Sequence, residues 1–206
     1  MLTPVKIAVM VSGGGTNLQA LIDAEASGII KSGKISLVLS NNADAFALTR
    51  ASRAGIPTAV VLKKDCKDAY DFESRLIEIL DENGIEIIVL AGFMSILSER
   101  FTSRYSDRII NVHPSLIPSF CGKGFYGLRV HEAALEYGVK VSGATVHFVN
   151  EIPDGGKIIM QKAVEVKDGD TPEILQRRIM EEAEWKILPL ACEKVSMEIL
   201  KNKGNS

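Results

Sequence analysis

The sequence predicts a single α/β domain, and three observations lead to that prediction. Short β-branched segments alternate with segments whose apolar residues recur at helical spacing. Of the 206 residues, 46% are hydrophobic and 24% charged, which is enough apolar material for one sizeable core. One expected strand, residues 85–90, is apolar along nearly its whole length, as is typical of a strand buried on both faces of a parallel sheet.

The first half of the chain repeats a strand–helix unit. A β-branched strand at residues 6–11 ends in three glycines, and Leu18, Leu21 and Ile22 then share one face of a helix over residues 17–26. The elements expected next are a strand at 35–39, a helix at 43–54, a strand at 58–62, a helix at 67–82 that stops at Asn83-Gly84, and the strand at 85–90.

The second half begins with a fifth strand at residues 108–112 and changes character after it. A loop rich in proline, glycine and aromatic residues follows at 113–127, and loops of that length are usually functional. The remaining expected elements are a helix at 128–137, two mutually antiparallel strands at 142–149 and 157–166, a helix begun by Thr171-Pro172-Glu173, a second helical stretch after Leu188-Pro189, and a frayed polar tail at about 201–206.

Composition excludes several classes of protein. The 24 Lys and Arg residues nearly balance 26 Asp and Glu residues, which argues against a nucleic-acid binder. The longest nearly apolar stretch, residues 85–94, is about half of what a membrane-spanning helix needs, and the N-terminus lacks a secretory pattern. Cys66, Cys121 and Cys192 are far apart and show no metal-binding or disulfide spacing. A cytoplasmic protein with reduced thiols and no membrane partner is therefore expected.

The first candidate site is the segment SGGGTN at residues 12–17, between the first strand and the first helix. Backbone N–H groups and the helix dipole favour an anion there. Leu18 stands where a dinucleotide fingerprint needs glycine, and no Lys-Ser/Thr pair follows the glycines as in a nucleoside triphosphate loop. A small phosphate monoester is left as the favoured ligand. The alternative is that the glycines only form a tight turn.

The second candidate is the pair Asn111 and His113, at the carboxyl end of a buried strand. Strand alternation places both side chains on one side, at the edge of the sheet where α/β proteins bind ligands. An amide that stabilises an oxyanion and an imidazole that moves protons suit acyl transfer. A purely structural histidine beside a proline-rich loop is the alternative.

The third candidate is Asp154, in the turn Pro153-Asp154-Gly155-Gly156. A carboxylate near the imidazole would raise the pKa of the histidine, although the same residues also make an ordinary turn. Ser115 and Cys121 lack the motifs that surround catalytic nucleophiles. Of the two other histidines, His131 is expected on a helix surface and His147 in the interior, where it could support the site.

Four segments in order carry a family resemblance: SGGGTN at 12–17, AGFMSIL at 91–97, NVHPSLIP at 111–118 and HFVNEIPDGG at 147–156. They closely resemble the phosphoribosylglycinamide formyltransferases of purine biosynthesis, over nearly the whole chain. The resemblance implies a formyltransferase-type α/β fold, an open, twisted, mostly parallel sheet with helices on both faces and an antiparallel strand toward the C-terminus. It also implies formyl transfer from 10-formyltetrahydrofolate to the amine of 5'-phosphoribosylglycinamide, with no metal.

The resemblance also assigns roles to individual residues. It makes Asn111, His113 and Asp154 the catalytic trio. The residues implied to bind the phosphoribosyl substrate are Gly15, Thr16, Asn17, Glu184 and, more weakly, Glu181. Those implied to bind the folate are Lys67, Met94, Ser95, Ile96, Leu97, Asn111, Asn150, Glu151, Ile152, Pro153 and Asp154. Lys67 stands where the resembled family typically has an arginine. The loop at 119–127 is also longer than in many relatives.

Rival functions remain at this stage. Formyltetrahydrofolate deformylase resembles the same core with a similar histidine and aspartate but carries an extra N-terminal domain, and methionyl-tRNA formyltransferase adds a C-terminal RNA-binding domain. A non-catalytic module that binds a phosphorylated metabolite would need only the glycine loop, which would leave Asn111, His113 and Asp154 without a shared purpose. The nearly neutral charge neither predicts nor forbids a homodimer.

Overall fold

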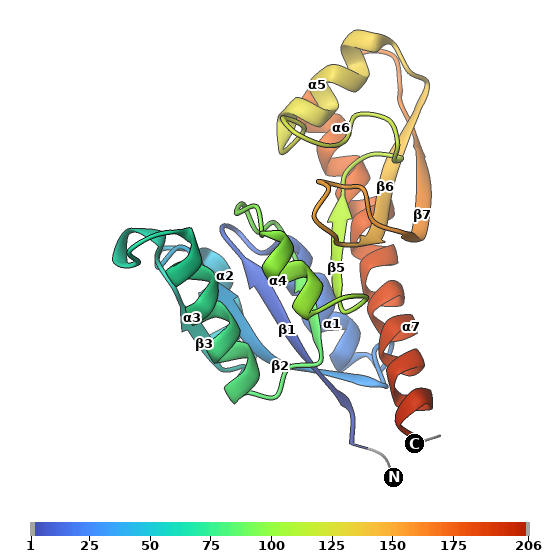
Figure 1. The fold of residues 1–206 in the computed structure, drawn as a ribbon. Helices are drawn as coiled ribbons and strands as arrows, with labels where there is room; N and C mark the ends of the chain where they lie inside the picture. Colours follow the sequence, from blue (N-terminus) through green and yellow to red (C-terminus); the bar gives the residue numbers. More distant parts are fainter. Residues whose placement is uncertain (1–2, 205–206) are drawn as a thin grey trace.

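One seven-stranded sheet runs through the molecule in the computed structural model, which describes residues 3–204 (Figure 1). The strands lie in the order β3-β2-β1-β4-β5-β6-β7. Their bounds are β1 Val5–Val11, β2 Gly33–Ser40, β3 Thr58–Val60, β4 Ile87–Leu90, β5 Ile109–His113, β6 Val141–Phe148 and β7 Ile158–Glu165. The first five strands are parallel, whereas β6 is antiparallel to both β5 and β7. The predicted α/β sheet, mostly parallel with an antiparallel C-terminal part, is confirmed.

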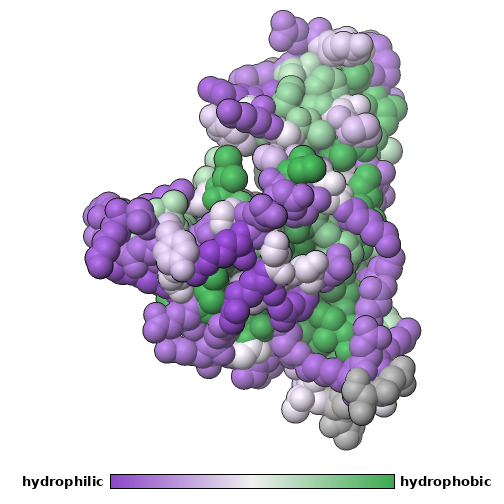
Figure 2. Space-filling model, viewed as in Figure 1, coloured by the Kyte–Doolittle hydropathy of each residue, from purple (hydrophilic) through white to green (hydrophobic). Residues whose placement is uncertain are grey.

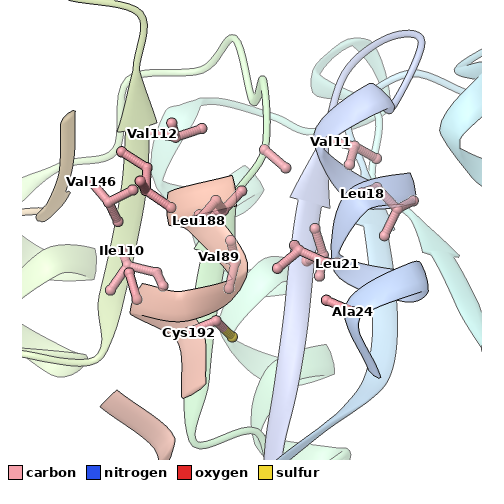
Figure 3. Close-up of a cluster of buried hydrophobic side chains, with 14 of the residues drawn as sticks. Val11, Leu18, Leu21, Ala24, Val89, Ile110, Val112, Val146, Leu188 and Cys192 are labelled. Atoms are coloured by element: carbon pink, nitrogen blue, oxygen red, sulfur yellow. The ribbon is translucent and has the colours of Figure 1, made fainter. Parts of the chain in front are cut away.

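Helices cover both faces of this sheet. Their bounds are α1 Thr16–Ala26, α2 Phe46–Arg53, α3 Ala69–Glu82, α4 Glu99–Arg104, α5 Leu128–Tyr137, α6 Pro172–Ile179 and α7 Trp185–Gly204, with a 3-10 turn at Lys63–Asp65 and a π turn at Met180–Glu184. On one face Leu18 and Leu21 of α1 and Leu188 of α7 pack over the sheet (Figure 3). On the other face α3 and α4 contribute Phe72 and Phe101 to a second core. Two separate apolar layers thus hold the sheet rigid from either side.

Helix α4 is absent from the sequence prediction because it has only six residues, too few to show a helical period. Its start is fixed by the buried carboxylate of Glu73 on α3, which accepts hydrogen bonds from both the backbone N–H and the hydroxyl of Ser98. This cap comes from a distant part of the sequence, so no local pattern reveals it.

The C-terminal helices also differ from the prediction. The helical path bends through the π turn at Met180–Glu184, and Pro189 lies inside α7 rather than marking the start of a new helix. Pro189 is buried near the beginning of α7, where its missing N–H removes only one early hydrogen bond. The tail expected to fray is helical as far as Gly204, and Lys203 forms an ion pair with Glu86. Residues 205–206 lie outside the described residues.

The loops that leave the carboxyl ends of the strands are joined to one another. The Met94 N–H, after β4, donates a hydrogen bond to the Ser12 hydroxyl, after β1, over 2.8 Å. Asn41, after β2, donates its side-chain amide to the Ser95 hydroxyl over 2.8 Å. The candidate segments found in the sequence therefore form one edge of the sheet. Among residues 3–204, no helix is long and apolar enough to cross a membrane.

Candidate active site

The three predicted catalytic side chains meet at the edge where β5 and β6 pair. Asn111 lies opposite His147 in the antiparallel register, and His113 is two residues further along β5. The carboxylate of Asp154 lies between two imidazoles, with one oxygen 3.5 Å from Nδ1 of His113 and the other 3.5 Å from Nε2 of His147. The proximity that sequence alone could not establish is present.

Asp154 reaches this position from the turn between β6 and β7. Its φ of 56° lies in the left-handed region, which is uncommon for a non-glycine residue and is tolerated best by Asp and Asn. Gly156 allows the turn to close, because a Cβ there would lie 1.7 Å from the backbone oxygen of Phe148. The segment is therefore a tight turn whose geometry also aims a carboxylate at two histidines.

His147 orients the amide of Asn111. The Nδ1 atom of His147 is 2.8 Å from the Phe148 carbonyl oxygen, which can only accept, so this nitrogen carries a hydrogen. In the neutral ring Nε2 then accepts from the Asn111 amide nitrogen, 3.2 Å away. One N–H of Asn111 is engaged in this contact and its second N–H can still reach a ligand. His147, which local reasoning left as an interior residue, thus supports the site.

The electrostatics of the trio differ in part from expectation. Burial lowers the pKa of His113, and this effect outweighs the opposite influence of Asp154, so the expected net rise in the pKa of this histidine is wrong. Burial alone would raise the pKa of Asp154, but the neighbouring imidazoles of His147 and His113 and the N–H of Gly122 hold it below its ordinary value. Asp154 is therefore an anion at neutral pH beside a largely neutral imidazole.

The glycine loop after β1 forms a second polar site, separate from the Asn111–His113–Asp154 trio. Gly15 caps α1 with a left-handed backbone, φ 71°, and a Cβ there would lie 2.6 Å from the Ala47 Cβ, so glycine is required at this position. Asn17 donates its side-chain amide to Glu184 over 2.7 Å, which brings two predicted substrate-binding residues together. Burial raises the pKa of Glu184 to about 7, although the Asn17 hydrogen bond opposes this effect.

Glu181, the weaker predicted binding residue, lies apart from this pair. Its carboxylate accepts from the Arg177 guanidinium over 2.8 Å on the exposed side of the helix. The π turn explains the separation because it directs Glu184 into the protein and leaves Glu181 outside.

Sequence reasoning also missed Arg50. Its Nε donates a hydrogen bond to the Gly14 oxygen over 2.9 Å, which places a cation beside the glycine loop.

Most of the predicted folate-binding residues line one small cavity of about 140 Å³ beside the trio. The lining residues are Leu90, Phe93, Ser95, Ile96, Leu97, Asn111, His147, Val149, Asn150, Glu151, Ile152, Pro153 and Asp154. Ile96 and Ile152 are 79% and 58% exposed, and Figure 2 shows apolar side chains gathered where the loops after β4 and β6 approach each other. Lys67 and Met94 are exposed residues outside this lining. The cavity therefore offers an apolar mouth next to polar groups.

A larger, mostly apolar cavity of about 630 Å³ lies between α1 and α7, where Thr16 and Trp185 are among the lining residues. None of the three catalytic candidates contributes to it. Size alone therefore does not mark the reactive site in this molecule, and the convergence of hydrogen-bonding and titratable groups does.

His131 corrects another expectation, because it is fully buried rather than on a helix surface. Val130, His131 and Ala134 form the inner face of α5, a spacing that could have revealed this burial. Burial lowers the pKa of His131 to about 4, and neither ring nitrogen has a hydrogen-bond partner within residues 3–204. Ser115 is also buried and donates its hydroxyl to the Ser119 oxygen over 2.6 Å, which fits its structural interpretation.

Residues 5–192 match the protein family described as Formyl transferase. The chain is 42% identical to phosphoribosylglycinamide formyltransferase of Haemophilus influenzae over 200 residues, which covers 97% of this chain and 91% of that protein. A crystal structure of glycinamide ribonucleotide transformylase 1 from Symbiobacterium toebii superimposes with a TM-score of 0.88 at 40% identity, covering 95% of this chain and 89% of that one.

Some relatives are much longer than this chain. The trifunctional purine biosynthetic protein adenosine-3 of Homo sapiens is 47% identical over 191 residues, which is 93% of this chain but only 18% of that protein. The chain therefore corresponds to about a fifth of these trifunctional relatives.

Proposed function

The chain belongs to the formyl transferase family, and we propose that it transfers a formyl group from 10-formyltetrahydrofolate to the amine of 5'-phosphoribosylglycinamide. The observation that carries the proposal is the convergence of Asn111, His113 and Asp154 at one edge of the sheet, beside a cavity that the predicted folate residues line. The names of the Haemophilus and Symbiobacterium relatives support the same acceptor.

The proposed reaction begins when the glycinamide amine attacks the formyl carbon of the folate. A C–N bond forms, and the former carbonyl oxygen becomes an oxyanion. The free N–H of Asn111 and the Nδ1–H of the minor, protonated form of His113 stabilise this charge, and hydrogen bonds to His147 and to the Phe120 carbonyl hold the two side chains in place. Asp154 favours the charged form of His113 at the moment when the oxyanion develops.

Collapse of the intermediate breaks the bond between the formyl carbon and N10 of the folate. The attacking amine must lose one proton and N10 must gain one, so a single proton transfer balances the reaction. Asp154, which is anionic at neutral pH, would hold a water that carries this proton from the amine to N10. The mechanism requires neither a metal nor a covalent enzyme intermediate.

The two substrates would approach from different loops of the same edge. The phosphate binds the backbone N–H groups of Gly15, Thr16 and Asn17, with Arg50 supplying a positive charge beside them. Glu184 accepts hydrogen bonds from the ribose or glycinamide part. The folate lies along the loops at 94–97 and 150–154, where the apolar mouth receives its ring system.

A spectrophotometric assay of the purified protein tests this function. The protein is incubated with 10-formyltetrahydrofolate, with and without 5'-phosphoribosylglycinamide, and the formylated product is identified by mass. We expect folate consumption that depends on the glycinamide substrate. Release of formate without that substrate would instead establish a deformylase, and no consumption in either sample would point to a binding module.

A further inference from the structure

The long loop at residues 119–127 makes backbone contacts with two catalytic residues at once. The Phe120 carbonyl oxygen is 2.9 Å from Nε2 of His113. Two residues later, the Gly122 N–H donates to Asp154 Oδ2 over 2.8 Å, the same oxygen that faces Nδ1 of His113. The loop, the imidazole and the carboxylate therefore close a ring of contacts.

These contacts determine which nitrogen of His113 can exchange a proton. A carbonyl oxygen only accepts hydrogen bonds, so Nε2 of His113 keeps its hydrogen in both the neutral and the charged ring. Proton exchange is then confined to Nδ1, which faces Asp154. The titratable groups around this ring are Asp154 from the turn after β6, His147 from β6, His131 from α5 and Cys121 from the loop itself.

Aromatic packing holds the loop in this conformation. Phe120 adopts a left-handed backbone with φ 49°, an arrangement that persists only when the surroundings enforce it. Its ring meets Phe125 edge-on, with centroids 6.4 Å apart, and Tyr137 of α5 at 6.0 Å. The Ser115 hydroxyl also donates to the Ser119 oxygen at the start of the loop. Phe120 is thus the residue through which the loop is anchored to the rest of the protein.

We propose that residues 119–125 form a positioning element of the active site, in which Phe120 anchors a backbone clamp that fixes the tautomer of His113 and the orientation of Asp154. The proposal rests on the formyl transfer proposed above. The loop contributes backbone groups rather than reactive side chains, so its amino acids act through His113 and Asp154. The long loop, which is longer here than in many of the relatives that this sequence resembles, would thus have a role in the active site.

Kinetics of Phe120→Ala provide the first test. Loss of the anchor should lower kcat by about 100-fold, the effect expected of a catalytic group displaced by about 1 Å, while KM for both substrates changes little. The acid limb of the pH profile of kcat should also shift, because Nδ1 and Asp154 lose their fixed separation. A general loss of folded protein would lower the active concentration without moving this profile.

Two further variants control for stability. Tyr126→Ala alters the same loop at a half-exposed ring that contacts Arg129 and not the clamp, and we expect it to retain wild-type kcat and pH profile. Phe125→Leu removes the ring that contacts Phe120 while keeping an apolar side chain, and it should reproduce the kcat loss in milder form. Thermal unfolding of all three variants establishes that they are folded under the assay conditions.

Nitrogen NMR of the histidine rings tests the clamp without any turnover. In the ligand-free wild type above the pKa of His113, we expect the Nε2–H tautomer alone, and in Phe120→Ala a mixture of both tautomers. A wild-type His113 that carries its proton on Nδ1, or a Phe120→Ala variant with the kinetics of Tyr126→Ala, would overturn the proposal. If the wild type fails to formylate its substrate, the proposed function is wrong. The His113 tautomer measured by NMR still tests the clamp in that case.

Discussion

The glycine loop and the β5–β6 site, which form the two ends of the candidate active site, differ in how exposed their polar groups are. The glycine loop after β1 offers exposed backbone groups at Gly13 and Gly14, whereas the site on β5 and β6 consists of buried side chains, with His113 4% and His147 1% exposed. In Figure 1 these ends belong to different parts of the sheet, one beside α1 and the other below the lobe of α5, β6 and β7. Binding a charged phosphate needs accessible donors, while a proton transfer needs groups whose protonation and direction are fixed.

The largest expected effect is at the buried end. Asn111→Ala or His113→Ala should raise the activation barrier by about 3 kcal/mol each, the typical cost of losing one oxyanion donor, and so lower kcat by roughly 100-fold. KM for the phosphorylated substrate should change little, because the glycine loop is untouched. Steady-state kinetics and circular dichroism check both points, and near-normal turnover in either variant would remove the catalytic assignment.

Glu184 is the main exception to this difference in exposure, because it is a buried titratable group beside the exposed glycine loop. Its pKa is raised from 4.5 to about 7, so the folded state holds a proton that the unfolded state releases. The contribution to stability is complete below pH 4.5 and is lost as the pH rises toward 7, and the pKa difference corresponds to about 3 kcal/mol.

Glu184→Gln removes this dependence. The variant should therefore be more stable than the wild type at pH 8.5, by up to about 3 kcal/mol, and nearly equal to it at pH 4.5. Urea unfolding at the two pH values measures the difference. Equal stability changes at both pH values would show that ionisation of Glu184 does not limit the stability of the fold.

A smaller effect is expected within the glycine loop itself. Gly15→Ala forces a Cβ onto Ala47 at a left-handed position and should cost about 1–3 kcal/mol of stability. It should also raise KM for the phosphorylated substrate. Gly13→Ala is the matched control, because a Cβ there meets nothing within 4 Å, and we expect a change within about 0.5 kcal/mol. Equal effects of the two substitutions would contradict the geometry described for Gly15.

The smallest effect should come from Glu181→Ala. Glu181 is paired with Arg177 on an exposed helix surface, so its loss should change stability by less than about 0.5 kcal/mol. KM for the phosphorylated substrate should change less than twofold, on the order expected for a residue that does not touch the ligand. A large rise in KM would instead support the prediction from the family resemblance that Glu181 binds the substrate.

The sequence is most informative where function and local pattern coincide. Apolar strands and glycine turns predict the parallel core, and strand alternation alone places Asn111 beside His113. Helix α4, the π turn before Glu184 and the contacts of the 119–127 loop depend on tertiary contacts between distant residues, which no local spacing encodes. His131 is an intermediate case. The apolar spacing of Val130 and Ala134 indicates that this face of α5 is buried, but the polarity of the imidazole led to the prediction of a surface residue.

The order of the strands has one more consequence. The chain leaves β1 toward α1 on one face and leaves β4 toward α4 on the opposite face, so the two neighbouring strands form a topological switch point. The placement of the glycine loop after β1 beside the 94–97 loop after β4 is thus a property of the chain's winding and not of any side chain in those loops. Substitutions in those loops can change which ligand is bound and how fast it reacts, while the place of binding stays where the winding reverses.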